Sequence, residues 1–202
     1  MVAMAACAPR SSSPPSPFIK GTRNGLVDVG TPETAATMPS KRAVEEAVQK
    51  AQRARQSRPA TPLPVVEQTD GSLQSALTAL QAGHSEAAHL RVAADYLRVG
   101  VWDKAYDHFC EALEINPRSA SALDGRARLL RDAGLFGLAL ADAHRAIYFA
   151  PASGEASNTL GTILERQGLC REALSAYRRA ARLNPQAGWA AANAERMAAR
   201  CP

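Results

Sequence analysis

The histidines and carboxylates are the side chains that could perform catalysis or hold a metal ion. The histidines are His84, His89, His108 and His144. None forms an H-E-x-x-H pair, the spacing that places two imidazoles on one helix face. Asp103, Asp107 and Glu111 are spaced by one helical turn, as an acid–base pair can be, but carboxylates at this spacing usually form a solvated helix face. The sequence therefore predicts no enzyme, no metal site and no cofactor.

Three prolines mark an internal repeat. Pro117, Pro151 and Pro185 are 34 residues apart, and each closes a block with the same pattern of small and large residues. The blocks are 86–119, 120–153 and 154–187. A fixed period of this length is typical of a solenoid, in which each unit buries its apolar face against its neighbours.

Each block contains two helical stretches on either side of a glycine. The glycines are Gly100, Gly134 and Gly168. Glycine tolerates the left-handed geometry that ends a helix, and proline disfavours helical geometry in the residue before it. Each block is therefore a helix–turn–helix unit that ends just before its proline. Ile115, Phe149 and Leu183 recur two residues before the prolines, and we expect them to be core residues that fill the gap to the next repeat.

These blocks resemble the tetratricopeptide repeat, whose motif runs W-x2-L-G-x2-Y, then A-x3-F, then P over 34 residues. Ala105-x3-Phe109 matches the second half of the motif, and Leu160-Gly161-x2-Leu164 matches the first half. The resemblance covers residues 86–202 and implies an all-α, right-handed α-solenoid. Arg126 replaces a core leucine of the motif, so we expect looser helix packing in the middle repeat.

The chain before the repeats has a different composition. Residues 1–71 contain nine of the thirteen prolines and a single aromatic residue, Phe18. Such a segment cannot bury enough apolar surface to offset its ordering entropy, so we expect a disordered N-terminal arm. Residues 41–56 could form a short helix within the arm, with too little apolar surface to pack firmly.

Residues 72–202 form the predicted repeat domain, and both of its ends need a cap that shields an apolar face from water. A short helix over 72–82, with Ser72 as its N-cap, precedes the first repeat. Residues 188–200 form an amphipathic helix that covers the third repeat.

The formal net charge of +5 is spread along the chain: residues 1–71 carry nine basic and six acidic groups, and 72–202 carry fifteen and thirteen. The basic stretch from Lys50 to Arg58 contains no aromatic residue on which a base could stack, so we predict no nucleic-acid partner. No run approaches 18 apolar residues, so we expect no transmembrane helix.

The cysteines can be placed on the predicted repeats. Cys110 follows Phe109 on a second helix, and we expect a free, half-buried side chain there. Cys170 lies at the turn of the third repeat and Cys201 ends the capping helix. First helices of adjacent repeats run nearly parallel, so Cys201 should lie close to that turn. Two alternatives stay open: Cys170 and Cys201 form a disulfide, or they are not bridged. The bond would require an oxidising compartment.

Cys7 raises the question of a lipid anchor, because Met4-Ala5-Ala6-Cys7 and the Ser/Pro-rich spacer after it look like the end of a bacterial lipoprotein signal. The six residues before Cys7 contain no basic residue and are too short for the apolar core of a secretion signal. Two locations therefore stay open. The protein is cytoplasmic if its start is correct, and faces the bacterial cell envelope or periplasm if Cys7 ends a truncated signal.

The resemblance implies a concave surface lined by the first helix of each repeat. Its candidate partner-binding residues are Asp124, Arg128, Arg131, Asn158, Thr162, Glu165, Arg166 and Arg196. Arginines in such a surface can pair with carboxylates or peptide carbonyls. The family's clamp for acidic chaperone C-termini is absent, because its positions hold Leu90, Ala94, Gly125, Glu155 and Thr159.

These observations favour a non-catalytic scaffold that binds a peptide or protein segment in the concave groove. The alternative is a structural subunit of an envelope, secretion or pilus complex that uses the convex face or the ends of the array.

Overall fold

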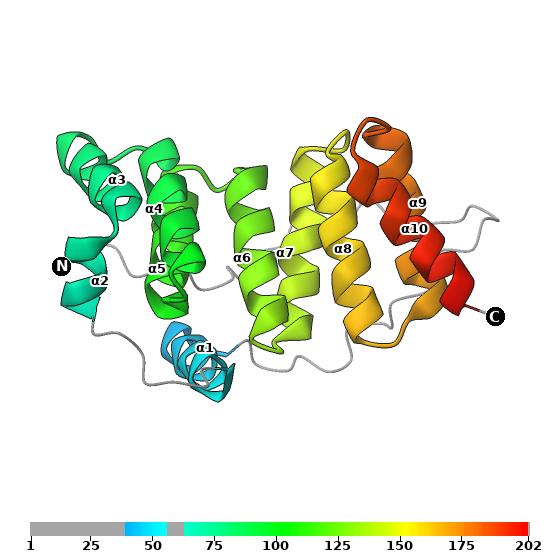
Figure 1. Cartoon of the computed structure of the whole chain (residues 1–202), viewed down its shortest axis with the longest axis horizontal. Helices are drawn as coiled ribbons and strands as arrows, with labels where there is room; N and C mark the ends of the chain where they lie inside the picture. Colours follow the sequence, from blue (N-terminus) through cyan, green and yellow to red (C-terminus); the bar gives the residue numbers. More distant parts are fainter. Residues whose placement is uncertain (1–38, 56–62, 202) are drawn as a thin grey trace.

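The computed structural model describes residues 39–55 and 63–201. Every regular element in these ranges is an α-helix. The helices are α1 (Lys41–Arg55), α2 (Leu63–Thr69), α3 (Gly71–Ala82), α4 (Glu86–Arg98), α5 (Trp102–Ile115), α6 (Ala120–Asp132), α7 (Phe136–Phe149), α8 (Gly154–Arg166), α9 (Cys170–Leu183) and α10 (Gly188–Arg200). The pairs α4–α5, α6–α7 and α8–α9 stack side by side, with α3 at one end and α10 at the other (Figure 1). The predicted all-α fold of stacked helical repeats is confirmed.

The turn inside each pair depends on a glycine in the left-handed region. Gly100, Gly134 and Gly168 have φ values of 80°, 79° and 78°. Just after Gly100, the amide of Val101 donates to the carbonyl of Tyr96 at 2.8 Å, and equivalent bonds follow the other two glycines. This is the Schellman motif, which satisfies carbonyls left open at a helix end.

The first helix of each pair begins at a serine that the sequence analysis did not single out. Ser85, Ser119 and Ser153 are N-caps, and each hydroxyl accepts a hydrogen bond from the amide three residues later, at 3.2, 3.1 and 3.1 Å. Their 34-residue spacing is a repeat signal in its own right. The second helices have no side-chain cap, because each follows the glycine turn directly.

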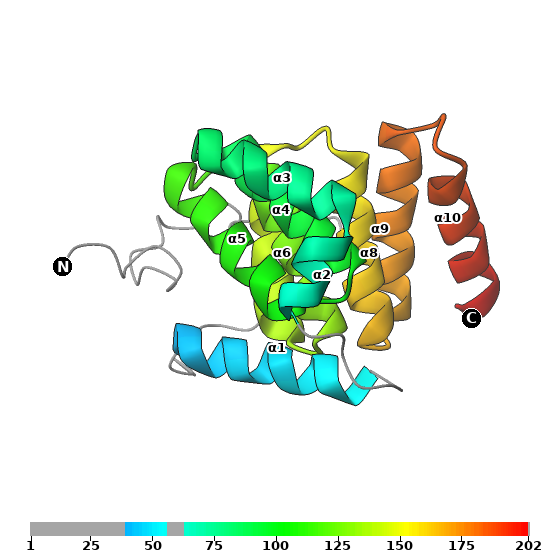
Figure 2. The same ribbon diagram turned by 60° about the vertical axis from the view of Figure 1, so that its left-hand side comes forward.

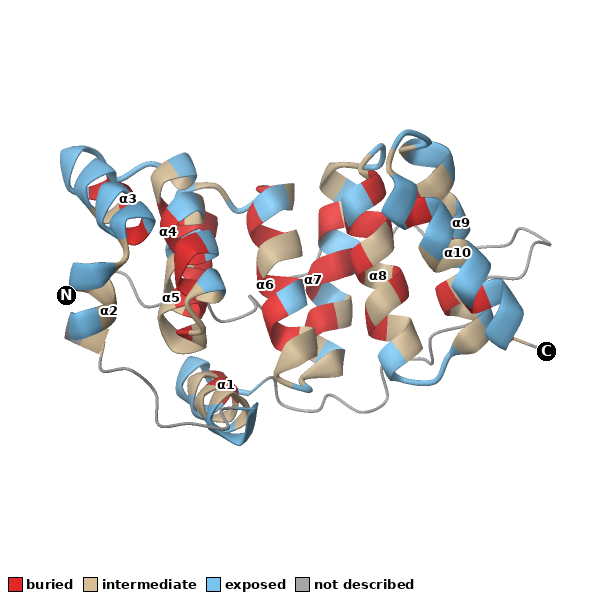
Figure 3. Cartoon of the chain, viewed as in Figure 1, coloured by how far each residue is buried: buried red, intermediate tan, exposed pale blue. Residues whose placement is uncertain are grey.

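The core lies along the contact faces between the helices, and most of α3 and α10 is exposed (Figure 3). Small residues allow the helices of a pair to approach closely. A Cβ atom added at Gly161 on α8 would lie 2.7 Å from the Cδ1 atom of Tyr177 on α9, whose side chain is fully buried. Only glycine fits this crossing without displacing an aromatic ring.

Two of the three residues expected to fill the gaps between repeats do not do so. Ile115 is 49% exposed and Leu183 is 37% exposed, so the prediction is wrong for both, whereas Phe149 is partly buried. Each is the last residue of its helix, beyond the turn that packs on the neighbouring repeat. The contact of α5 with the next repeat comes instead from Ala112 and Leu113, which cluster with buried residues of α6.

Arg126 does not loosen the middle repeat as expected. Its guanidinium is buried and donates two hydrogen bonds to the carboxylate of Asp142 on α7, Nε to Oδ2 at 2.7 Å and Nη2 to Oδ1 at 2.9 Å. Leu123 and Ala127 on the same helix are fully buried beside it. A buried, bidentate ion pair therefore replaces the leucine of the motif.

Part of the arm expected to be disordered is helical. Residues 1–38 and 56–62 lie outside the described residues, but α1 and α2 fall within the predicted arm. Val44 and Val48 of α1 are buried against the array, so the expectation that this helix would not pack firmly is wrong. Figure 2 shows α1 lying crosswise beneath the lower ends of the stacked helices. The side chain of Gln52 on α1 accepts a hydrogen bond there from the amide of Trp102, the first residue of α5, at 2.7 Å.

The helix before the first repeat is capped by a different residue from the one predicted. Asp70, not Ser72, is the N-cap of α3, and its carboxylate accepts from the amide of Leu73 at 2.8 Å. The hydroxyl of Ser72 instead donates to Asp95 on α4 at 2.9 Å. Asp70 also pairs with Arg98 of α4, so the cap helix is tied to the first repeat by polar contacts as well as by buried leucines.

Candidate peptide-binding groove

The predicted partner-binding residues lie on the first helices α6 and α8 and on the capping helix α10, and most of them line one hollow. Asp124, Arg128 and Arg131 are on α6, Asn158, Thr162, Glu165 and Arg166 are on α8, and Arg196 is on α10. A hollow of about 570 Å³ is lined by Arg131, Asp132, Thr162, Glu165, Arg166, Arg196 and Arg200. The structure therefore brings five of the predicted residues together there, while Asp124, Arg128 and Asn158 lie outside this lining.

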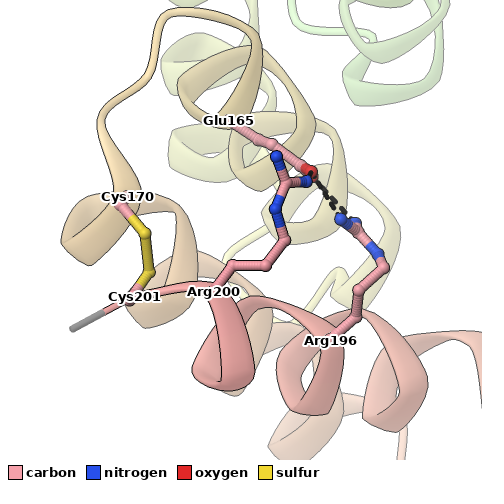
Figure 4. Close-up of a disulfide and its surroundings, with 5 residues drawn as sticks. All are labelled: Glu165, Cys170, Arg196, Arg200 and Cys201. Carbon is pink, nitrogen blue, oxygen red and sulfur yellow. Dashed lines mark hydrogen bonds and ion pairs between the residues drawn. A yellow bond between two sulfur atoms is a disulfide. The ribbon is translucent and has the colours of Figure 1, made fainter.

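Glu165 is the centre of the polar contacts in the hollow. The guanidinium of Arg196 binds its carboxylate with two nitrogens, with Nη2 at 2.8 Å from Oε2, and Nη1 of Arg200 lies 3.0 Å from Oε1 (Figure 4). The hydroxyl of Tyr177 donates to Oε2 at 2.7 Å. The hydrogen bonds from Arg196, followed by that from Tyr177, lower the pKa of Glu165 to about 2. The carboxylate is therefore charged at neutral pH and fixes α10 against α8.

Arg131 forms the opposite wall of the hollow. Its guanidinium donates to both carboxylate oxygens of Asp132 at 3.0 Å, and its Nη1 donates to the hydroxyl of Thr162 at 2.8 Å. That hydroxyl donates in turn to the carbonyl of Thr159 at 2.8 Å. The chain of bonds links α6 to α8 and holds the arginine in one orientation.

The remaining predicted residues have separate surroundings. Asn158 accepts a hydrogen bond from the side chain of Asn193 on α10 at 2.8 Å, a partner that the sequence analysis did not identify. Burial raises the pKa of Asp124, and its Oδ1 atom has no hydrogen-bond partner within the described ranges. Arg128 and Arg166 are exposed, and no ion pair joins either of them to another described residue.

A disulfide joins the third repeat to the last helix. Cys170, the first residue of α9, is bonded to Cys201, which follows α10, with 5.8 Å between their Cα atoms (Figure 4). The expectation of a free Cys110 is wrong, because Cys110 is buried and disulfide-bonded. Cys7, the candidate for lipid attachment, lies outside the described residues.

The structure also brings together histidines that are separated in the sequence. His89 on α4 lies between His84 and His108, with ring centroids 5.5 and 5.3 Å away, and Glu111 of α5 lies beside it. Burial lowers the pKa of His89 and that of His108, which favours the neutral form of both imidazoles. The spacing of the histidines in the sequence, which contains no H-E-x-x-H pair, did not indicate this grouping.

No family model and no curated protein matches this sequence. Solved structures with similar folds do exist. The first tetratricopeptide domain of Spaghetti (RPAP3), bound to an HSP90 peptide, has a TM-score of 0.55 at 18% identity over 57% of this chain and 94% of that one. MamA of Desulfovibrio magneticus has a TM-score of 0.55 at 17% identity over 78% and 85%. The tetratricopeptide domain of Arabidopsis OM64 has a TM-score of 0.55 at 22% identity over 58% and 97%.

At these identities the likeness shows the fold alone. Within residues 39–55 and 63–201, no helix combines the length and apolar character needed to cross a membrane. Three stacked helix pairs with glycine turns, together with these structural neighbours, show that the chain has the tetratricopeptide repeat fold, which is typical of protein–protein interaction.

Proposed function

We propose that this protein is a non-catalytic scaffold that binds an acidic segment of another protein in its concave groove. The observation that carries the proposal is the charge of the hollow across α6, α8 and α10. Four arginines and two carboxylates line it, which leaves a net positive charge of two (4 − 2 = 2). A hollow with this charge attracts acidic peptides and orients them through charge-assisted hydrogen bonds.

The arginines divide into two groups with different roles. Arg131, Arg196 and Arg200 are held by Asp132 and Glu165, so they shape the walls of the hollow. Arg166 of α8 lines the hollow and Arg128 of α6 lies outside its lining; both are exposed, and within the described residues neither holds a carboxylate in an ion pair. These two side chains are therefore the ones that a carboxylate of a partner can engage without first displacing an internal one.

A neighbour with the same fold supports this choice of ligand. The Spaghetti domain holds the peptide SRMEEVD, which contains three acidic side chains. The clamp positions of such chaperone-tail receptors are occupied here by other residue types, with Leu90 and Ala94 on α4 among them. The proposal is thus an acidic segment other than a chaperone tail.

The test uses fluorescein-labelled heptapeptides from an acidic library, with binding measured by fluorescence polarisation. Arg128→Ala combined with Arg166→Ala should weaken the selected peptides at least about tenfold per lost charge-assisted bond, and salt should weaken them further. Arg178→Ala is the matched control, because Arg178 is an exposed arginine on α9, a second helix. Unchanged affinity in the double variant would reject the groove.

A second candidate function is that of a structural subunit in an envelope, secretion or pilus complex. Exposed apolar side chains near the ends of the second helices favour it: Tyr148 is 61% exposed, and Ile115 and Leu183 are exposed as well. Such residues are suited to contacts with another subunit. Tyr148→Ser with Ile115→Ser should then abolish co-purification of the partner, while the arginine variants leave it intact.

The location of the protein belongs to the same proposal. The Cys170–Cys201 disulfide suits an oxidising compartment, which favours the cell envelope over the cytoplasm. Thiol labelling of the protein as it is purified from its host, without reductant, tests this, since a reduced Cys170–Cys201 pair would reject the oxidising compartment.

A further inference from the structure

The cluster at the first helix pair has the composition of a transition-metal site. His89 of α4 and His108 and Glu111 of α5 each offer one donor atom, and these atoms lie close together. His89 Nδ1 lies 3.1 Å from His108 Nδ1 and 2.8 Å from Glu111 Oε2, and His108 Nδ1 lies 3.3 Å from the same oxygen. His89 lies 19 and 22 positions before His108 and Glu111 in the chain, and the fold brings the three metal-binding atoms within 4.8 Å of one another.

These distances match the geometry of a metal coordination sphere. In a tetrahedral zinc site with bonds of about 2.05 Å, neighbouring ligand atoms are about 3.3 Å apart. The three donor atoms are 2.8 to 3.3 Å apart, and a point about 2.0 Å from all of them lies about 1 Å to one side of their plane. One cation can therefore bind all three with only small movements of the side chains.

Protons and a cation are alternative links between these three atoms. Both Nδ1 atoms lie within hydrogen-bond distance of Oε2 of Glu111, at 2.8 and 3.3 Å, so each neutral imidazole can donate an N–H to that oxygen. A cation at a common point takes the place of these protons, and all three atoms then act as electron-pair donors.

The surroundings support two of the donor groups. Nε2 of His89 lies 3.4 Å from Nδ1 of His84, so His84 can accept the N–H on the far side of the ring, as outer-shell partners of zinc-bound histidines do. The ring of Tyr96 stacks on His108 with 5.6 Å between the centroids. Glu111 is 48% exposed on its side chain, which leaves a route for an ion and a position for water as a fourth ligand.

We propose that His89, His108 and Glu111 bind a divalent zinc-type ion that links α4 to α5. Two imidazoles and one carboxylate are ligands that Zn²⁺ accepts, whereas Ca²⁺ and Mg²⁺ select oxygen ligands. The site stabilises the first helix pair and is separate from the groove on α6, α8 and α10. It stands independently of the proposed peptide binding.

The test uses the full-length protein without an affinity tag, stripped with a chelator and titrated with ZnCl₂ in a calorimeter. The wild-type chain should bind one ion per molecule, and Co²⁺ in its place should give the visible absorption of a site with nitrogen ligands. Loss of outer-shell partners costs zinc sites about 10- to 100-fold in affinity, so loss of a ligand in Glu111→Gln or His108→Ala should cost at least about 100-fold.

Two controls make the outcome decisive. His144→Ala removes a histidine of α7 that lies outside the cluster, and it should bind zinc as the wild type does. Glu111 and His108 are both partly exposed, so their variants should keep the wild-type circular dichroism spectrum. The proposal fails if the wild type shows no saturable zinc binding, if Ca²⁺ binds equally well, or if correctly folded Glu111→Gln and His108→Ala keep wild-type affinity.

Discussion

The guanidinium of Arg196 on α10 binds the carboxylate of Glu165 on α8 with two nitrogens, so the last helix is joined to the third repeat across the groove. Arg200 and Tyr177 contact the same carboxylate. A single acidic residue therefore joins three helices, α8, α9 and α10.

The Glu165 contacts should make stability depend on pH in the acid range. The pKa of Glu165 is about 2 in the folded chain against an ordinary value of 4.5. Its contribution to the free energy of unfolding is therefore complete above about pH 5 and is lost as the pH falls from 4.5 toward 2. The wild type should melt at a higher temperature than Glu165→Gln at pH 7, and the gap should shrink by pH 3. A gap of the same size at both pH values would contradict the assignment.

Removing the disulfide should destabilise the last helix. Cys201→Ser opens the link between α9 and α10, and cross-links that close loops of this length contribute about 3 to 4 kcal/mol. Denaturant unfolding measures the loss, and hydrogen exchange should localise it to the amides of α10. The variant is a cleaner probe than a reductant, because Cys110 is disulfide-bonded as well. Equal unfolding free energies would show that the link is dispensable.

The buried pair of Arg126 and Asp142 should show strong coupling. Asp142→Ala removes the carboxylate from a buried guanidinium and should cost about 3 to 5 kcal/mol, whereas Arg126→Leu combined with Asp142→Ala should recover most of that loss. Arg145→Ala is the control, since this half-exposed arginine lies 3.7 Å from the same carboxylate and should cost less than about 1 kcal/mol. If the double variant is as unstable as Asp142→Ala, the pair is not the source of the coupling.

Two glycine-to-alanine changes should have opposite signs. Gly161→Ala forces a methyl group against the buried ring of Tyr177 and should cost about 1 to 3 kcal/mol. Gly137→Ala on α7 places its methyl group in open space and should stabilise the protein by up to about 1 kcal/mol through helix propensity. Thermal melting of both variants compares them directly, and destabilisation by Gly137→Ala would count against the described packing.

The fold could be predicted from sequence where one residue constrains its own backbone. The first helices end at Gly100, Gly134 and Gly168, whose φ values are positive. The second helices end just before Pro117, Pro151 and Pro185, because proline disfavours helical geometry in the residue that precedes it. The 34-residue recurrence of these residues is visible without any knowledge of contacts. Ser85, Ser119 and Ser153 carry the same signal at the helix starts, and it could have been recognised.

What could not be predicted depends on pairs of residues from different helices. From sequence alone, Arg126 is an unfavourable replacement of a core leucine, because its partner Asp142 lies on a different helix. The contact of His89 with Glu111 likewise depends on the packing of α4 against α5. The packing of α1 is of the same kind, since two buried valines suffice once α5 offers a surface for them. The exposure of Ile115 shows the converse: its periodicity matched a core position, but the helix ends there.

The bond between Cys170 and Cys201 closes the C-terminal end of the array. In a solenoid each unit is stabilised only by its neighbours, so local opening spreads from the ends. Because α10 is covalently tied to the start of α9, this end cannot open by release of α10 alone. The arginine-lined hollow between α8 and α10 should therefore keep its walls when the ends of the array fluctuate.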